Sequence, residues 1–597
     1  MTWIRRLDYD EHWQGVIDFG IEVTAVGYVL LSSARSSAMA KDAKEDVSVS
    51  TEVASNAHNG HAAHSDAAVI DHADNKLLAE LGYKAEFKRE FSRIETIAFA
   101  FSIMGVIASV SSTLSFPLVS GGHVGMVFGW LIPSLFVMPI ALCMAELASS
   151  MPTSAGLYYF SARLAPPRWS ALASWITAWA NITGQVTLVC SIDFTCAQMI
   201  TTALAVGSDG SINLGNGPTF GILLAILFVH GLVCSAATKV IARLNLFYVV
   251  INVGTTIGAI IALYVCAGDN KVSTRDAFTK FENNTGQYTG DGWAFLLAFT
   301  APMWTLTGYD SAAHISEETA NASRAAPLAI ITSDYTFLLL INQHEILSPK
   351  GVATTAALGW LTLIAASFAL VSVPALLESN LSLPMGQLFL DVLGKKGMLT
   401  IWAFIIVVQV EPWFVTGAAQ TVDASRVVFA FARDGALPGS RYWRRINART
   451  QTPVHAVWLV VCVAGVCGVL GFSDAALSSL AGMAVIGLYT SYATPIFLRI
   501  TSGREKLVPG PFSLGRWGVP LGCIAVSWVS FIVVLLVFPS VQNVTAQDMN
   551  YAIVILMAVF IYAGLHWVLS AHRWFTGPLK TTEGSIRSPT NSNYEKD

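Results

Sequence analysis

Charged residues are scarce in this chain. They make up 12% of its 597 residues, whereas a soluble domain carries roughly 25%. Hydrophobic residues make up 54%, and the mean hydropathy is +0.56. A chain of this length cannot bury so much apolar surface in one soluble core, so lipid must act as solvent for much of it. The shortage of charge therefore indicates an integral membrane protein embedded in a lipid bilayer.

The sequence also lacks the signatures of several other protein classes. Its 35 Lys and Arg are balanced by 39 Asp and Glu, so no basic surplus indicates a nucleic-acid partner. It contains no H-E-x-x-H, no G-x-S-x-G and no phosphate-binding G-x-x-x-x-G-K-[ST] motif. We therefore expect no enzyme, no cofactor and no metal site, and a membrane-embedded enzyme stays only as a minor alternative.

Cysteine pairs of the C-x-x-C type are missing as well. The eight cysteines lie almost wholly inside apolar runs; they are Cys143, Cys190, Cys196, Cys234, Cys266, Cys462, Cys467 and Cys523. We interpret them as small buried hydrophobic residues rather than as disulfides or metal ligands.

Residues 1–90 differ from the rest and are predicted to form a largely disordered cytosolic tail. The stretch 36–75 is rich in Ala, Ser, Asp, Lys and His, a composition that does not bury a core. A His-rich run there, HNGHAAHSDAAVIDH, could bind metal, but we interpret it as solvated polar chain. Met39 offers an alternative start, so residues 1–38 are either part of the tail or a gene-model extension.

From Phe91 onward about twelve apolar segments follow, each near the ~20 residues that a helix needs to cross ~30 Å of hydrocarbon. They define a twelve-helix membrane domain over 91–572, followed by a tail over 573–597 that is expected to be cytosolic. The expected spans are 95–117, 124–148, 170–200, 219–238, 244–266, 293–313, 355–377, 397–420, 453–471, 476–498, 517–538 and 550–571.

Lysine and arginine gather in alternate loops. If the N-terminal tail is cytosolic, the loops expected inside carry most of these residues, including the six arginines of 426–449. The loops expected outside carry few, and the Lys and Arg of 267–292 are offset there by Asp and Glu. This positive-inside bias predicts that both termini are cytosolic.

The sixth segment contains residues that a spanning helix should avoid. In APMWTLTGYD the apolar run meets Pro302, Thr305, Gly308 and Asp310. Every backbone polar group in lipid must be satisfied within the protein, so a break survives only where it is buried or lines a watery cavity. We predict two half-helices with an irregular join near 302–308.

The first segment, IAFAFSIMGVIASVSSTLSF, offers a matching break at Gly105. Segments one and six are five apart, the spacing expected of two inverted five-helix repeats with discontinuous helices at the substrate site. Segments eleven and twelve would lie outside the repeat. The alternative is that Gly105 and the nearby serines merely let helices pack closely.

Two such breaks would bind a small zwitterion without charged side chains. Free amides after Gly105 suit a carboxylate, and unwound carbonyls of 103–104 and 302–305 suit an ammonium. Aromatic rings would cover the apolar part or hold a quaternary ammonium. The candidate substrate-binding residues are Ile103, Met104, Gly105, Val106, Ile107, Phe299, Pro302, Met303, Trp304, Thr305, Gly308 and Tyr309.

Two stretches interrupt the pattern. Residues 333–351 lengthen what should be a short connection before the seventh span, and 410–417 put Glu411 and Pro412 inside the eighth. Each is either functional or a gene-model error.

Region 91–572 resembles the amino acid–polyamine–organocation transporters, and within them the fungal GABA/choline permease group. The resemblance rests on AELASSMPTSAGLYYFSARLAPPRW, on GYDS…HISEE…N…P after residue 307, and on ASRVVFAFARDGALPGSRYW. It implies a leucine-transporter-like fold and proton-coupled uptake at the plasma membrane. It also implies that Glu317 and Glu318 lie in the inner gate region rather than in the pocket.

The resemblance leaves the proton-coupling residue open. Some bacterial relatives use a lysine in the fifth helix, and this chain has none there. The candidates are Asp310, Glu146, Asp193 and Glu411; Asp310 is either solvated near the inner boundary or a proton or substrate group. We expect a secondary transporter that imports a GABA-like, choline-like or neutral amino acid substrate with protons. A non-transporting nutrient sensor on the same scaffold is the alternative.

Overall fold

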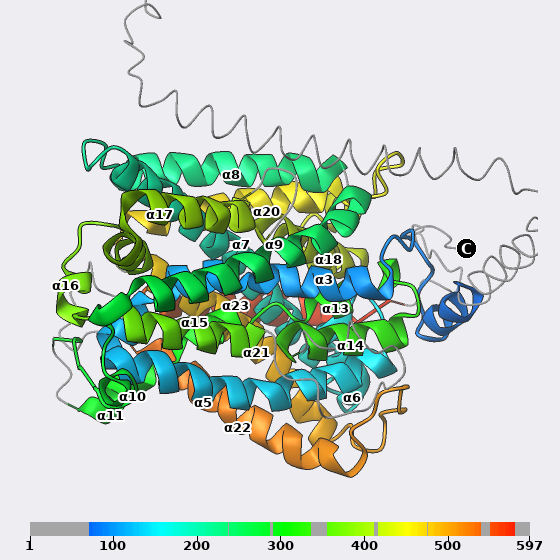
Figure 1. Cartoon of the computed structure of the whole chain (residues 1–597). Coiled ribbons are helices and arrows are strands. Elements are labelled where there is room, and N and C mark those ends of the chain that lie inside the picture. Colours follow the sequence, from blue (N-terminus) through cyan, green and yellow to red (C-terminus); the bar gives the residue numbers. More distant parts are fainter. Residues whose placement is uncertain are drawn as a thin grey trace, which may run out of the picture. The chain divides into compact units, whose positions relative to one another are not determined.

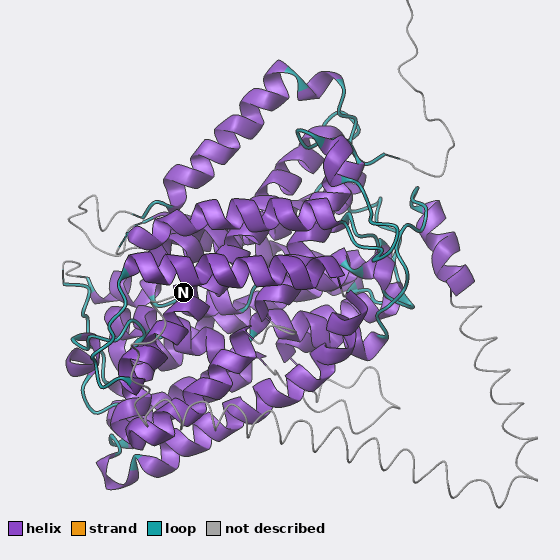
Figure 2. Cartoon of the chain, turned by 90° about the horizontal axis from the view of Figure 1, so that it is seen from above, coloured by secondary structure: helices purple, strands orange, loops and turns teal. Residues whose placement is uncertain are grey.

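The computed structural model describes residues 71–236, 238–286, 290–335, 355–410, 416–473, 476–538 and 550–579. The unit over Ala73–Asp597 is built of helices, and its long helices run side by side along a common direction (Figure 1). Loops gather at the two ends of this bundle (Figure 2). Within those ranges the only β-pairing is an isolated parallel bridge between Phe91 and Thr319.

The described residues up to position 335 form the first part of the helical bundle. Its helices are α3 (Arg93–Met104), α4 (Val106–Thr113), α5 (Ser115–Ser150), α6 (Gly156–Leu164), α7 (Ser170–Gly207), α8 (Asn216–Ala236), α9 (Thr238–Cys266), α10 (Thr274–Thr279), α11 (Asp291–Leu297), α12 (Thr300–Thr305), α13 (Ser311–His314) and α14 (Ala322–Tyr335). A 3-10 turn, η2 (Ser316–Glu318), follows α13. The α5 helix is interrupted at Gly121 and Gly122, where the backbone is not helical.

The helices from position 355 onward complete the bundle. They are α15 (Thr355–Ala369), α16 (Val373–Leu377), α17 (Pro384–Val410), α18 (Thr416–Arg433), α19 (Ser440–Trp443), α20 (Val454–Cys467), α21 (Ala476–Ile500), α22 (Gly518–Val537) and α23 (Ala552–Leu569). In Figure 1, α10, α11 and α16 lie at one end, and α6, α13 and the blue segment before α3 at the other.

Nine helices in the described ranges are long and apolar enough to cross a membrane. They correspond to predicted segments one to five and nine to twelve. Large apolar side chains are exposed along their outer faces, for example Phe228 on α8, Phe247 on α9 and Val568 on α23. Such a surface suits lipid rather than water, so the chain is a multi-pass membrane protein.

The remaining three predicted spans are not single helices in the structure. The span expected at 293–313 consists of α11, α12 and α13. The span expected at 355–377 ends early, because α15 stops at Ala369 and α16 is separate. Helix α14, which was not predicted to be part of the bundle, packs against α3 and α5.

The span expected at 397–420 is also divided. Helix α17 ends at Val410 and α18 begins at Thr416. Both pack against α7, so the two helices belong to the same bundle. The inserted residues Glu411 and Pro412, and most of 333–351, lie outside the described residues.

The folded unit extends beyond the boundaries expected at 90 and 573. Residues 71–80 are helical, and Tyr83 and Phe87 are buried. At the other end, Phe575 is buried too. Met39 and His58, His61 and His64 lie outside the described residues.

The cysteine prediction was partly wrong. All eight are unpaired, and four of them are buried as expected: Cys143, Cys190, Cys196 and Cys234. Three others, Cys266, Cys462 and Cys523, are exposed. They lie on lipid-facing sides of helices, where an apolar thiol needs no protein partner.

Helices α7 and α21 make a close backbone contact. A Cβ placed on Gly184 would lie 2.6 Å from the Leu488 amide nitrogen, and one on Gly487 would lie 2.7 Å from the Gly184 nitrogen. Two glycines therefore let these helices touch along their backbones, as small residues do in membrane bundles.

Replacing Gly184 with alanine tests this contact. The added Cβ forces the two backbones apart, which should destabilise the fold by about 1–3 kcal/mol. The measurement is the apparent melting temperature of the purified protein in detergent, which should fall. Gly254→Ala is the matched control, because a Cβ at Gly254 on α9 meets nothing within 4 Å. Equal melting temperatures for the two variants would contradict the assignment.

Candidate functional site

Gly105 separates α3 from α4. Its φ of 42° and ψ of 66° place it in the left-handed region, and it caps the end of α3 and the start of α4. A glycine tolerates this conformation, whereas a residue with a Cβ is strained there. The break that the sequence predicted at this position is present.

The start of α4 exposes main-chain donors. The first main-chain hydrogen bond of this helix runs from the Ser109 amide to Gly105 O, at 2.8 Å. The amides of Val106, Ile107 and Ala108 therefore have no acceptor within α4. On the other side of the break, the Ser109 hydroxyl donates to Met104 O at 2.6 Å, which satisfies one of the last carbonyls of α3.

The second break lies at residues 306–310, between α12 and α13. Gly308 has a φ of 84°, again a conformation that favours glycine. The prediction placed this join at 302–308 and was wrong by several residues. Pro302 falls in the first turn of α12, where its missing N–H is tolerated, and its carbonyl accepts the Leu306 amide at 2.9 Å.

Two tyrosines of α21 satisfy the backbone of this second break. The Tyr489 hydroxyl donates to Leu306 O at 2.6 Å, and the Tyr492 hydroxyl accepts the Gly308 amide at 3.4 Å. The unwound segment is thus held by side chains, as irregular backbone at membrane depth requires.

The two breaks lie against each other. A Cβ on Gly308 would be only 2.5 Å from Ile103 Cγ2, one residue before the end of α3. Helix α12 packs on α4, and α13 packs on α3. Beside Gly105, a Cβ would be 3.0 Å from Thr416 Oγ1 on α18. That hydroxyl is 2.9 Å from the Tyr248 hydroxyl of α9.

Residues around both breaks are closed off from solvent. Ile103, Met104, Val106 and Ile107 are exposed by 3% or less, and so are Met303, Trp304, Thr305 and Tyr309. The structure therefore represents a closed conformation in which neither side has open access to the breaks.

The aromatic residues predicted near the site take different positions. Trp304 donates its indole N–H to the Ser191 hydroxyl at 3.0 Å, and Tyr309 packs 5.1 Å from the ring of Tyr492. Phe299 instead packs against Phe295 and against Trp528 of α22. Its predicted place at the break was wrong, because it lies two turns earlier and faces α22.

Asp310 ends the second break and is fully buried. Its Oδ1 accepts the Tyr492 hydroxyl at 2.7 Å. Its Oδ2 lies 3.2 Å from donor nitrogens of Asn181 and Gln185 on α7, and 3.2 Å from His314 Nε2. The sequence left open whether Asp310 is solvated or serves as a proton or substrate group. In this conformation it is not solvated.

Glu317 and Glu318 pair with two arginines of α18. Arg433 meets Glu317 through two nitrogens at 3.1 and 3.2 Å. Arg426 meets Glu318 at 2.7 and 3.3 Å. All four side chains are buried, so these bidentate pairs tie η2 to α18 at the end of the bundle where α6 and α13 also lie (Figure 1).

The segment before α3 covers this end. The Arg433 guanidinium lies 4.2 Å from the ring centre of Tyr83. Asp434, just beyond α18, accepts hydroxyls of Tyr83 at 3.2 Å and Tyr158 at 2.8 Å, and the Leu579 amide at 3.2 Å. Burial raises the pKa of Asp434 to about 6, and burial likewise raises the pKa of Tyr83. Both chain ends of the folded unit therefore pack onto the end of α18.

The other coupling candidates lie elsewhere. Glu146 pairs with Arg499 at 3.3 Å and accepts Ser513 and the Leu514 amide, which joins α5 to α21 and its following loop. Asp193 on α7 lies 3.1 Å from His230 Nδ1 on α8. Glu411 falls outside the described residues.

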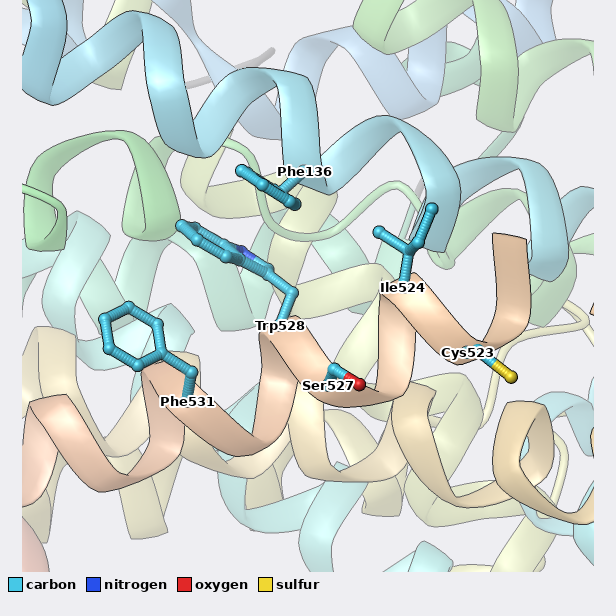
Figure 3. Close-up of a pocket in the computed structure, with 6 residues that line it drawn as sticks. All are labelled: Phe136, Cys523, Ile524, Ser527, Trp528 and Phe531. Atoms are coloured by element: carbon cyan, nitrogen blue, oxygen red, sulfur yellow. The ribbon is translucent and has the colours of Figure 1, made fainter. Parts of the chain in front are cut away.

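A groove on the surface is separate from both breaks. It lies between α5 and α22 and encloses about 430 Å³, with Phe136 stacked on Trp528 at a ring distance of 4.3 Å (Figure 3). It is lined by Phe136, Cys523, Ile524, Ser527, Trp528 and Phe531. Several of these residues are exposed and apolar, so the groove faces lipid. Among the described residues, no group of His, Cys, Asp and Glu side chains could hold a metal ion.

Sequence reasoning missed several residues near the breaks. They include Asn181 and Gln185 on α7, Gln420 on α18 and Tyr492 on α21. Gln420 donates to Gln185, and its Oε1 would be 3.5 Å from a Cβ on Gly308. Their position in the sequence could have indicated them, because side-chain amides within long apolar segments are rare and usually functional. Which of them converge could not be deduced without the helix packing.

Comparison with known proteins gives a consistent result. Residues 91–560 match the family model described as amino acid permease. The chain is 36% identical over 526 residues to an uncharacterized amino-acid permease of Schizosaccharomyces pombe, with 87% of this chain and 92% of that protein covered.

Two further relatives have names that are not marked as uncharacterized. The chain is 35% identical over 514 residues to amino-acid permease BAT1 of Arabidopsis thaliana, covering 84% of this chain and 95% of that protein. It is 34% identical over 516 residues to the GABA-specific permease of Saccharomyces cerevisiae, covering 85% and 86% respectively.

Arg433→Ala tests the ion pairs between η2 and α18. It leaves the Glu317 carboxylate buried without its partner, so it should destabilise the fold by roughly 3–5 kcal/mol. Lys395→Ala is the control: its pair with Asp209 has a similar distance of 2.8 Å but is exposed, and its loss should cost less than about 1 kcal/mol. The comparison uses melting temperatures in detergent. Similar small losses in both variants would show that the buried pair does not stabilise this end of the bundle.

Proposed function

This chain belongs to the amino acid permease family, and from that premise we propose that it imports a small amino acid or amine by alternating access around its two breaks. As a member of this family it is a transporter and not an enzyme. The proposed substrate is GABA-like, with neutral amino acids and choline as the nearest competitors. The GABA-specific permease among the relatives supports the first choice.

The observation that carries the proposal is the contact between the two breaks, in which Gly308 of the 306–310 segment lies against Ile103, two residues before Gly105. The amides of Val106 and Ile107 open toward this contact at the positive end of α4, where a carboxylate is stabilised. Main-chain carbonyls at the ends of α3 and α12 are acceptors for an ammonium group. A zwitterion of modest length would therefore bind backbone dipoles at both ends, with Trp304 and Tyr309 covering its apolar part.

The proposal also includes the architecture of a transporter with inverted repeats. We take α11–α13, α14–α15 and α17–α18 as crossings six, seven and eight, which with the nine candidate spans gives twelve. The breaks in crossings one and six support two repeats of five. Crossings eleven and twelve, α22 and α23, would stand outside them.

Orientation, location and coupling belong to the proposal as well. The arginines near Arg426 and Arg433 support a cytosolic position for that end of the bundle. The N-terminal segment and residue Leu579 pack there, so both termini would be cytosolic. Glu317 and Glu318 would then close the inner gate. We place the protein in the plasma membrane and take protons as the coupled ion.

Uptake of labelled substrates tests the proposed function. The full chain is expressed in a permease-deficient host and supplied with labelled GABA, choline and neutral amino acids, with and without a protonophore. GABA should accumulate, and the protonophore should abolish the accumulation. Binding without accumulation would favour a nutrient sensor, and neither binding nor uptake of any amine would contradict the proposal.

Gly308→Ala tests the site itself. The added Cβ meets Ile103 at 2.5 Å, so it should displace the two breaks and lower uptake by about tenfold or more. Gly286→Ala is the matched control. It has a similar φ of 71°, but nothing lies within 4 Å of its Cβ. With equal surface expression, unchanged uptake by the Gly308 variant would exclude the breaks as the substrate site.

A further inference from the structure

Three ionisable side chains form a buried cluster next to the second break. They are Asp310 at the end of the unwound segment, His314 on α13 and Asp423 on α18, and each is exposed by 1% or less. Ionisable groups inside a membrane protein are costly, and they persist mainly where they serve substrates, ions or protons. The hydrogen bonds of this cluster define the charge that each member carries.

His314 is held as a cation. Its Nε2 lies 3.2 Å from Asp310 Oδ2, and its Nδ1 lies 3.3 Å from the carbonyl oxygen of Ser154. The Ser154 carbonyl is an acceptor, and Asp310 is an acceptor when it is ionised, so an ionised Asp310 requires both ring nitrogens to donate, which only the doubly protonated ring can do. The ring is also fixed in place, because a Cβ on Gly156 would be 2.7 Å from its Cε1.

Asp310 is held as an anion. It accepts the Tyr492 hydroxyl and the side-chain amides of Asn181 and Gln185, in addition to the His314 ring. Donors that surround a carboxylate stabilise its charged form. Together Asp310 and His314 make a neutral pair.

Asp423 has no such support. Neither of its oxygens has a hydrogen-bond partner among the described residues, although both are buried. The nearest side-chain donor is the Gln185 NH2 group, which faces Asp423 but is shared with Asp310, while Gln185 Oε1 accepts from Gln420. Arg426, one turn later on α18, is bound by both oxygens of Glu318. Asp193 and His230 lie beside Gly417 at the start of the same helix, where they pair with each other.

The charges of the neighbouring side chains then indicate that Asp423 is protonated. The His314 and Asp310 charges cancel, the Arg426 and Glu318 charges cancel, and an ionised Asp423 would leave one bare negative charge in the closed protein. Burying an unpaired charge is far more costly than protonating it. We propose that Asp423 is the proton-binding residue of this transporter, carrying one proton in the closed state beside the neutral pair of Asp310 and His314.

Helix α18 connects this proton to the substrate site. The same helix carries Thr416 beside Gly105 and Gln420 beside Gly308, and it ends at Arg433 in the inner ion pairs. The proton would join an Asp423 oxygen from the outer water and leave to the inner water, and one positive charge would move inward with each zwitterion. Loss of the proton places the Asp423 charge beside Asp310, and this repulsion would separate α18 from α13.

This inference rests on the proposed function, and its test separates the two. The full chain is purified and reconstituted in liposomes with labelled GABA. One assay measures exchange of internal and external GABA without any gradient. The other measures GABA accumulation driven by an imposed pH gradient, together with alkalinisation outside. If the unchanged chain neither exchanges nor accumulates any amine, the proposed function fails.

Asp423→Asn mimics the protonated carboxyl and cannot release a proton. It should retain exchange but lose gradient-driven accumulation by about tenfold or more, with no GABA-dependent proton movement. Asp423→Glu keeps a titratable group and should restore accumulation. Accumulation by the Asn variant equal to that of the unchanged chain would overturn the proposal, and so would loss of both activities in a variant that is folded by size-exclusion chromatography.

A second variant covers the case in which Asp423→Asn does not fold. Asp423→Ser is smaller and also cannot ionise, so it should exchange GABA without coupling, while Asp423→Glu should couple. Coupled transport by the serine variant, or uncoupled exchange by the glutamate variant, would contradict the assignment. Asp193→Asn serves as a comparison: if it loses coupling while Asp423→Asn keeps it, the proton site is the Asp193–His230 pair instead.

Discussion

The structure depends on one constraint, which is that peptide groups inside a bilayer must be satisfied without water. The chain interrupts its helices at Gly105 and at 306–310 and meets the constraint with side chains. The Ser109 hydroxyl takes Met104 O, and Tyr489 and Tyr492 hold Leu306 and Gly308. The amides at the start of α4 are left without an acceptor in their own helix, and the proposed function uses them to bind the substrate carboxylate.

The same two breaks are connected by α13, η2 and α18 to the ion pairs at one end of the bundle. From the second break, α13 and η2 lead directly to Glu317 and Glu318. From the first, α18 leads from Thr416 to Arg426 and Arg433, which bind those two glutamates. A shift of α18 relative to α13 therefore changes the surroundings of the breaks and the inner ion pairs together. Such linkage is what alternating access requires, because the site and the gate must not move independently.

The sequence predicted those features that depend on local composition. Nine apolar segments matched helices long enough to cross a membrane, and Gly105 was identified because it lies at the middle of the first segment, five segments before the break expected in the sixth. The sequence predicted the position of the second break poorly, because proline is tolerated in the first turn of a helix as well as at a break.

Features that depend on packing between distant helices were not predictable. Phe299 was expected at the break, yet it faces Trp528 on α22. Cys266, Cys462 and Cys523 face outward, because lipid solvates a thiol as well as a core does. The partners of Asp310 come from α7, α13 and α21, and the isolated position of Asp423 is visible only when those partners are placed. The inner pairing of Glu317 with Arg433 joins residues 116 positions apart.

The most direct measurement is an experimental map, by electron cryo-microscopy, of the protein bound to GABA. The account predicts density between Gly105 and the 306–310 segment, with the carboxylate against the amides of Val106 and Ile107 and with α3 and α4 separated at Gly105. Density for the ligand at another place, such as the groove beside Trp528, or a continuous helix through Gly105 would contradict it.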